Sequence, residues 1–470
     1  MGLLQQLYIV VLNPLFRITG LLSDKVRGAI LQILLLFFPA YFIALYALLL
    51  THREIAVAWH LGNYTQKHLL CGVVLAFVIL FSVDRPLKKV PWNPLVWGLI
   101  TLCGIGILGT SLLHTVGSGY RVFGLMLVFE FPALCFVWNN RRDYEVFYDK
   151  VCYAGTFVGL CYYVFSCHLA WEGRLATQAF RYNALMENSN MFSMLGMVMF
   201  ACALYLLWRK RRQWAIIVYA AIALAAGTAI MLWGQSRISI AACAVGTGCW
   251  FLYYLIHCRE KQIVKDILIM LAIVAVATGG MLCLSSELTE HNEAVRDQRI
   301  IEAAEQNGRD VEAVKKAVAR EADLKDRVLP QDGQSMDEYT SGRIRIWNGY
   351  KEKLNLWGND FNSTDWEELT NNTVVHAHNN FLEMSYRCGV IVGGIFIVTE
   401  LVCGLIAIAY LFRKKYDAEF YLFPVLFLVI YAFESMFDIA TLPFERDAPF
   451  YFYLSILPML EGRIKPGSEQ

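Results

Sequence analysis

The sequence predicts an all-α polytopic membrane protein with about twelve transmembrane helices and one large helical extracytoplasmic loop. Of its 470 residues, 57% are hydrophobic and only 17% are charged, and the mean hydropathy is +0.45. Long apolar runs such as 28–50 and 214–233 can cross a hydrocarbon core roughly 30 Å thick as helices. Basic residues gather in alternate connections between these runs, which is typical of membrane proteins with a fixed orientation.

The N-terminal residues 1–20 are amphipathic and lack a small-residue cleavage site. We therefore expect a helix at the membrane surface rather than a cleaved signal. Twelve apolar segments follow, at roughly 28–50, 68–83, 92–113, 119–138, 146–169, 188–208, 213–232, 236–256, 266–285, 388–411, 419–437 and 448–462. The chain thus divides into about nine spans in 1–285, a large loop at 286–378 and about three spans in 379–470.

The orientation follows from the basic connections. They lie around residues 17–27, 85–89, 141–150, 209–212, 259–265, 413–415 and 463–465. By the positive-inside rule these segments and both termini are predicted to be cytoplasmic. The turn at 234–237, the segment at 171–187 and the loop at 286–378 are then predicted to be extracytoplasmic. The net charge of +1 favours neither nucleic acid nor an acidic partner.

The large loop contains two predicted helical stretches. The first, 286–335, is charged and typical of a solvated helix with a break at Asn307-Gly308; we assign it no chemistry. A second helix is expected to start near Ser341, because apolar side chains recur there at helical spacing. They are Ile344, Trp347 and Leu354.

The loop ends in a histidine-asparagine segment. Asn380 and Glu383 have the spacing of a capping box for the next helix. His376 and His378 are therefore expected at the mouth of a membrane helix.

Three arginines are candidate anion ligands. Arg237 opens a span between apolar runs, where an unpaired guanidinium is costly. It is either an interfacial or carboxylate-paired arginine or part of an anion site, since its fork of donors suits phosphate. Arg343 alone is an ordinary loop arginine, but together with Arg237 and Arg181 at one membrane face it indicates a second phosphate ligand.

His378 is the candidate general base. Imidazole titrates near neutral pH and can accept a hydroxyl proton; the alternative is a histidine that only satisfies local hydrogen bonds. A zinc site is less favoured, because His376 and His378 are two residues apart and no third ligand is evident. The sequence lacks an Asp-x-Asp pair, a phosphate-binding P-loop and a Gly-x-Ser-x-Gly elbow.

Taken in order, these clusters resemble the O-antigen ligase and O-antigen polymerase superfamily of bacterial envelope enzymes. The resemblance covers about residues 180–440. The matching residues are Arg181-Tyr182-Asn183, Glu187-Asn188-Ser189-Asn190, Gln235-Ser236-Arg237, Ser341-Gly342-Arg343 with Trp347, and His376-Ala377-His378-Asn379-Asn380-Phe381-Leu382-Glu383, followed by Gly389, Gly393 and Gly394. Ser189 stands where proline is common and Ile238 where glycine is frequent; these departures bear on the subfamily rather than on the enzyme class.

The resemblance implies a metal-independent, inverting glycosyl transfer without a cofactor, at the outer face of the bacterial cytoplasmic membrane. The donor would be a glycan on undecaprenyl diphosphate. Arg237 and Arg343, with Arg181 as a weaker candidate, would bind the diphosphate. His378 would deprotonate the acceptor hydroxyl, with His376 and Asn379 in support. The acceptor could be a growing glycan, a lipid A core or a protein, and the sequence does not choose between them.

Two other classes of function remain open. A transporter or flippase for a lipid-linked glycan would also have about twelve spans, but it should show internal repeats and broken or charged segments near the middle of the membrane. The ionisable clusters lie instead at one predicted face. A non-catalytic scaffold of an envelope complex is the third alternative.

Overall fold

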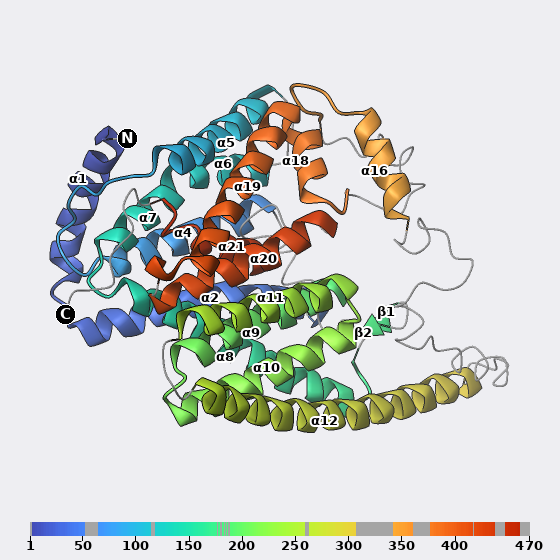
Figure 1. Ribbon diagram of the computed structural model, residues 1–470. Helices are drawn as coiled ribbons and strands as arrows, with labels where there is room; N and C mark the ends of the chain where they lie inside the picture. The colour runs from blue at the N-terminus through green and yellow to red at the C-terminus, as the bar shows by residue number, and fades with distance from the viewer. Residues whose placement is uncertain are drawn as a thin grey trace.

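The described part of the protein is mostly helical, as a computed structural model shows (Figure 1). The strands of this described part form one antiparallel pair of two residues each, β1 (Thr177–Gln178) and β2 (Arg181–Tyr182). The described residues are 2–51, 64–113, 118–175, 177–178, 181–182, 184, 186, 189–258, 263–306, 342–360, 377–416, 418–437 and 447–460.

The helices follow the predicted apolar segments closely. In chain order they are α1 (Gly2–Thr19), α2 (Asp24–Thr51), α4 (Tyr64–Ser82), α5 (Pro94–Leu113), α6 (Ser118–Leu125), the π-helix η1 (Met126–Glu130), α7 (Phe131–Asn140), α8 (Tyr144–Trp171), α9 (Ser189–Arg209), α10 (Trp214–Gly234), α11 (Arg237–His257), α12 (Ile263–Gln306), α16 (Arg343–Glu352), α18 (Asn380–Cys388), α19 (Val390–Phe412), the 3₁₀ turns η2 (Lys414–Tyr416) and η3 (Glu419–Tyr421), α20 (Leu422–Phe437) and α21 (Asp447–Ser455).

Nine helical segments in the described part are long and apolar enough to cross a membrane. This confirms a polytopic helical membrane protein. The segments predicted at 28–50, 68–83 and 448–462 coincide with α2, α4 and α21, which are not among the nine. The total of about twelve spans therefore stays a prediction.

Burial separates central helices from peripheral ones. In α9, 94% of the most apolar stretch is buried inside the protein, whereas in α12 only 11% is. A helix that is apolar all round and buried belongs at the centre of a bundle. The close packing of α9 on α10 depends on two glycines, since a Cβ on Gly196 would lie 2.7 Å from the carbonyl oxygen of Gly227 and the reverse is equally true.

Helix α12 is a single helix of 44 residues. It continues from the predicted span at 266–285 into the charged stretch that was predicted to begin the large loop. At 1.5 Å per residue it is about 65 Å long, roughly twice the thickness of a hydrocarbon core. It runs along the edge of the bundle and projects beyond it (Figure 1).

The described basic connections, around 17–27, 85–89, 141–150, 209–212 and 413–415, lie together at one end of the bundle. The backbone N–H of Lys88 donates to the side-chain oxygen of Asn140 over 2.9 Å. Arg209, at the end of α9, pairs with Glu145 of α8 over 2.7 Å and also with Glu419 of η3. Contacts between connections that are distant in sequence therefore hold this end together.

The other ends of the same helices meet at the opposite side. Tyr182 of β2 donates to Glu293 of α12 over 2.6 Å, and the Asn379 side chain donates to the carbonyl oxygen of Met436 over 2.9 Å. Helix α16, the β1–β2 pair and the projecting end of α12 all lie at this side of the bundle (Figure 1). Which end faces the cytoplasm remains a prediction from the basic residues.

Candidate functional site

Helix α18 is started by Asn379, one residue before the predicted cap. The Asn379 side-chain oxygen accepts from the backbone N–H of Leu382 over 2.9 Å, which is the contact expected of an N-cap residue. Asn380 is the first helical residue and is fully buried; its amide donates to Ser435 over 2.9 Å. The capping box predicted from Asn380 and Glu383 is thus wrong in register, because Asn380 binds α20 instead.

Glu383 fixes the segment that carries His378. Its carboxylate accepts from the backbone N–H of Ala377 over 3.0 Å and from Arg387 Nε over 2.7 Å. Both side chains of this ion pair are almost fully buried. Burial alone would lower the pKa of Arg387, but the neighbouring Glu383 raises it overall. The ion pair with Glu383 therefore offsets the cost of burying the Arg387 guanidinium.

His378 lies between these two fixed points. Its backbone φ is +48°, in the left-handed region that few non-glycine residues adopt. Ala377 on one side is held by Glu383, and Asn379 on the other side caps α18 and binds Met436. Strain of this kind persists only where the surroundings enforce it, and it is common at functional sites. The imidazole is partly buried.

Helix α16 docks directly on this segment. Trp347 Nε1 donates to the carbonyl oxygen of Ala377 over 2.9 Å, and the Tyr350 and Tyr386 rings meet edge to face at 5.0 Å. A small apolar cluster seals the contact. It consists of Ile346, Tyr350, Ala377 and Tyr386, flanked by Leu354 and Leu382.

Arg343 is the first residue of α16. It follows Gly342, whose φ of +78° is easily adopted only by glycine. Residues four apart share one face of a helix, so Arg343 lies one turn from Trp347, on the side of α16 that contacts Ala377. The structure therefore brings the Arg343 and His378 segments into one packed unit.

Two glycines lock the segment after α16 onto the start of α19. Gly358 (φ +91°) and Gly389 (φ +88°) lie back to back. A Cβ on Gly389 would overlap the carbonyl oxygen of Leu356, and one on Gly358 would overlap that of Arg387. Asn355 reinforces the junction, since its carbonyl accepts from the backbone N–H of Val390 over 2.9 Å.

Arg237 is the first residue of α11. The preceding Gln235 has a φ of +48°, and Ser236 caps the helix through Ser239 over 3.4 Å. Helix α11 packs along α20, and its far end bonds to Ala418, which precedes α20, through Tyr253 over 3.2 Å. The two helices are thus antiparallel, and Arg237 lies at the end where α20 reaches Met436, the partner of Asn379.

Arg181 and His376 are the remaining predicted site residues. Arg181 lies in β2, which contacts α9 and α10 at the same end of the bundle as Arg237. His376, Glu187 and Asn188 lie outside the described residues, as does most of 307–376. Arg237, Arg343 and the His378 segment therefore share one end of the protein, and the Arg343 and His378 segments are in direct contact.

Some buried charges were missed in the sequence reasoning. Glu383 and Arg387 have the i, i+4 spacing of a helical ion pair, but nothing in the sequence indicated their burial. Glu130 and Glu400 are single carboxylates in the middle of apolar helices, and each has one shielded oxygen without a hydrogen bond. A single carboxylate within an apolar run is the sequence signal that could have identified these two residues.

The described residues contain no group of three His, Cys, Asp or Glu placed to hold a metal ion. No protein-family model matches the chain, and no curated protein is detectably similar to it.

Proposed function

We propose that the protein is a membrane glycosyltransferase of the O-antigen ligase and polymerase type. It would transfer a glycan from undecaprenyl diphosphate to an acceptor hydroxyl at the outer face of the bacterial cytoplasmic membrane. The observation that carries the proposal is the Trp347 to Ala377 hydrogen bond. It joins the helix that begins with the candidate phosphate ligand Arg343 to the residue before the candidate base His378.

In the proposed reaction the acceptor oxygen attacks the anomeric carbon of the donor sugar. His378 accepts the acceptor proton. The bond from the anomeric carbon to the diphosphate oxygen breaks on the opposite side, and its electron pair stays on the diphosphate. The product is an inverted glycosidic linkage and a free lipid diphosphate.

The arginines would stabilise the leaving group. A diphosphate gains negative charge as the bond breaks, and fixed guanidinium groups can bind it without reorganisation. Arg237 and Arg343 each begin a helix, and the N-terminal N–H groups of a helix also favour an anion. Arg181 is a third, weaker candidate.

A second candidate function is a carrier that moves a lipid-linked glycan across the membrane. Glu130 and Glu400 favour it, because carboxylates in the middle of membrane helices often serve proton relays or substrate pathways. Such a protein would move the donor without forming a glycosidic bond. It would depend on Glu400 rather than on His378.

The test is a transfer assay with the full-length protein in liposomes that contain a lipid-diphosphate oligosaccharide and an acceptor glycan. We expect His378→Ala to slow transfer by about 10²–10⁴-fold, the usual contribution of a general base. Arg237→Ala and Arg343→Ala should each slow it by about 10²-fold, as loss of one charge-stabilising donor does. The readout is the glycan product resolved by mass.

Matched controls are His291→Ala and Arg345→Ala. His291 is half-buried on α12 and stacks on Trp171 at 4.5 Å, and Arg345 is exposed on α16 beside Arg343. Both variants should keep wild-type transfer. Full transfer by His378→Ala would refute the general-base role, and dependence on added divalent metal would refute the metal-free mechanism. If the protein moves the donor across the membrane without forming a glycan product, and the Glu400→Gln variant loses this movement, the carrier function would be favoured.

A further inference from the structure

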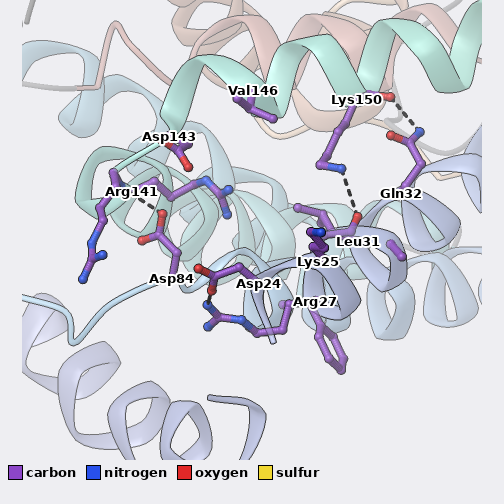
Figure 2. A pocket seen from close by; sticks show the side chains of 14 residues that line it. Asp24, Lys25, Arg27, Leu31, Gln32, Asp84, Arg141, Asp143, Val146 and Lys150 are labelled. Atoms are coloured by element: carbon purple, nitrogen blue, oxygen red, sulfur yellow. Dashed lines mark hydrogen bonds and ion pairs between the residues drawn. The ribbon is translucent and has the colours of Figure 1, made fainter. Parts of the chain in front are cut away.

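A cavity of about 560 Å³ lies at the basic end of the bundle (Figure 2). The site described above is at the opposite end. It is enclosed by the start of α2, the start of α8 and the connections that follow α4 and α7. Figure 2 shows Arg141, Asp84 and Lys150 arranged around it. The cavity thus lies where the helices are predicted to leave the cytoplasmic side of the membrane.

The cavity carries an excess of positive charge. Three carboxylates line it, from Asp24, Asp84 and Asp143, and its formal net charge is +2. The five cations that line it are Lys25, Arg27, Arg141, Arg142 and Lys150. Part of this charge serves the fold: Lys150 donates to the carbonyl oxygen of Gly28 over 3.0 Å, and Arg27 pairs with Asp24.

Two of the arginines are buried, and each has an N–H group without a hydrogen-bond acceptor. Arg27 and Arg141 are only 7% and 9% exposed. Each caps the end of α4: Arg27 donates to the Val83 carbonyl over 3.1 Å, and Arg141 donates to the Ser82 carbonyl. The Nε atom of each is shielded and has no hydrogen-bond partner. Burial lowers the pKa of Arg141, and only in part do Asp84 and Asp143 oppose this. An anion in the cavity would offset the cost of these desolvated charges.

Two further cations are available for a ligand. Lys25 and Arg142 are exposed, and neither side chain forms an ion pair within the described part of the chain. Asp84 binds the backbone of Arg142, because one of its oxygens accepts from the Arg142 N–H over 2.9 Å. The rim of the cavity can therefore contribute two uncompensated charges.

One wall of the cavity is apolar and continues onto the lipid-facing surface. Leu31, Phe81 and Val146 line it. Val146 is 38% exposed, and Ile33 on the same helix as Leu31 is 67% exposed. An amphiphile could place its charged group among the cations and its chains along α2 and α8.

We propose that this cavity binds a phosphate-bearing anion, and that its source is the headgroup of an anionic phospholipid. Guanidinium groups match phosphate in geometry and charge. Basic pockets between membrane helices on the cytoplasmic side are suited to anionic headgroups. The apolar wall favours a lipid over a soluble phosphate compound. This site is independent of the proposed transfer reaction.

The test is the thermal unfolding of the full-length protein in a nonionic detergent with three additives. They are dioctanoyl phosphatidylglycerol, dioctanoyl phosphatidylcholine with the same chains, and glycerol phosphate. A ligand that binds only the folded state raises the melting temperature with its concentration. We expect a saturable rise with phosphatidylglycerol and little or none with the other two.

The variant Lys25→Gln/Arg142→Gln should keep the melting temperature of the unliganded protein, because both side chains are exposed. It should raise the half-saturating lipid concentration by on the order of tenfold, because two cations that bind the anionic headgroup are lost. The control Lys88→Gln/Lys89→Gln removes two exposed cations of the same end that do not line the cavity, and it should bind like wild type.

An equal loss of phosphatidylglycerol affinity in both double variants would indicate general attraction to the charged surface and would overturn the proposal. So would the absence of a phosphatidylglycerol effect. A saturable rise with glycerol phosphate that Lys25→Gln/Arg142→Gln abolishes would support the phosphate site and assign it to a soluble ligand instead of a lipid.

Discussion

At the scale of single residues, the charge pair of Glu383 and Arg387 is the centre of the candidate site. Each side chain is less than one-tenth exposed, and Glu383 also holds the backbone of Ala377. Two desolvated charges add little stability when paired, but removal of one leaves the other without compensation. The pair therefore acts as a specific anchor for the His378 backbone.

Glu383→Gln should lower the stability of the protein by about 3–5 kcal/mol, because it leaves the buried Arg387 unpaired. The double variant Glu383→Gln/Arg387→Met should regain much of this loss, since it removes both charges. The measurement is thermal unfolding of the purified protein. Glu352→Gln, an exposed carboxylate on α16, is the control and should change little. A double variant as unstable as Glu383→Gln would argue against the ion pair as the cause.

At the scale of elements, the junction of α18 and α19 is built from two backbone segments in contact without side chains between them. Gly389 ends α18 and precedes α19, and Gly358 faces it from the segment that follows α16. The Trp347 hydrogen bond holds the middle of α16, and the glycine contact holds the segment that follows its C-terminal end. The position of Arg343 therefore depends on glycines far from it in sequence.

Gly389→Ala should destabilise the junction, because its φ of +88° is unfavourable for alanine and its Cβ would overlap the Leu356 carbonyl. We expect a loss of at least about 1–3 kcal/mol, together with a loss of glycan transfer. Gly394→Ala is the matched control, since a Cβ there has nothing within 4 Å and the residue is helical; it should be neutral or slightly stabilising. Similar melting temperatures for the two variants would contradict the close approach.

Sequence reasoning was most accurate for the helices and least accurate for their junctions. The segment predicted at 236–256 is α11, Arg237–His257, because apolar length alone sets such a span. The cap of α18 was misplaced by one residue, since Asn379 and Asn380 can both cap and only Ser435 on another helix distinguishes them. The sequence did not indicate that α12 is continuous. The change from apolar to charged residues marks the predicted end of the membrane span, but the backbone hydrogen bonds of the helix continue past this change. The π-helix η1 had no recognised signal.

At the scale of the whole molecule, two ends with different chemistry are separated by the length of the spans. One end holds the basic connections and the cavity of Figure 2. The other holds Arg237, Arg343 and His378. In the proposed function a lipid-linked donor meets the second end from within the membrane, and in the proposed lipid site anionic headgroups bind the first end.

The orientation can be measured with reporter fusions to truncated chains. Alkaline phosphatase, which is active only outside the cytoplasm, should be inactive after Gln213 and active after Gln306. A green fluorescent protein, which folds in the cytoplasm, should give the opposite result. The physical reason is the excess of Lys and Arg around 209–212, which is retained on the cytoplasmic side. The reversed pattern would place the candidate site in the cytoplasm and exclude the proposed outer-face reaction.

The length of α12 has a mechanical consequence. Its last twenty or so residues extend about 30 Å at the rise of an α-helix, and they leave the bundle as one stiff rod. Tyr182, through Glu293, and Leu175, through Asn292, hold its first half, and Ala304 near its far end is also buried. The Tyr182–Glu293 hydrogen bond therefore couples the position of this rod to β2, which carries Arg181.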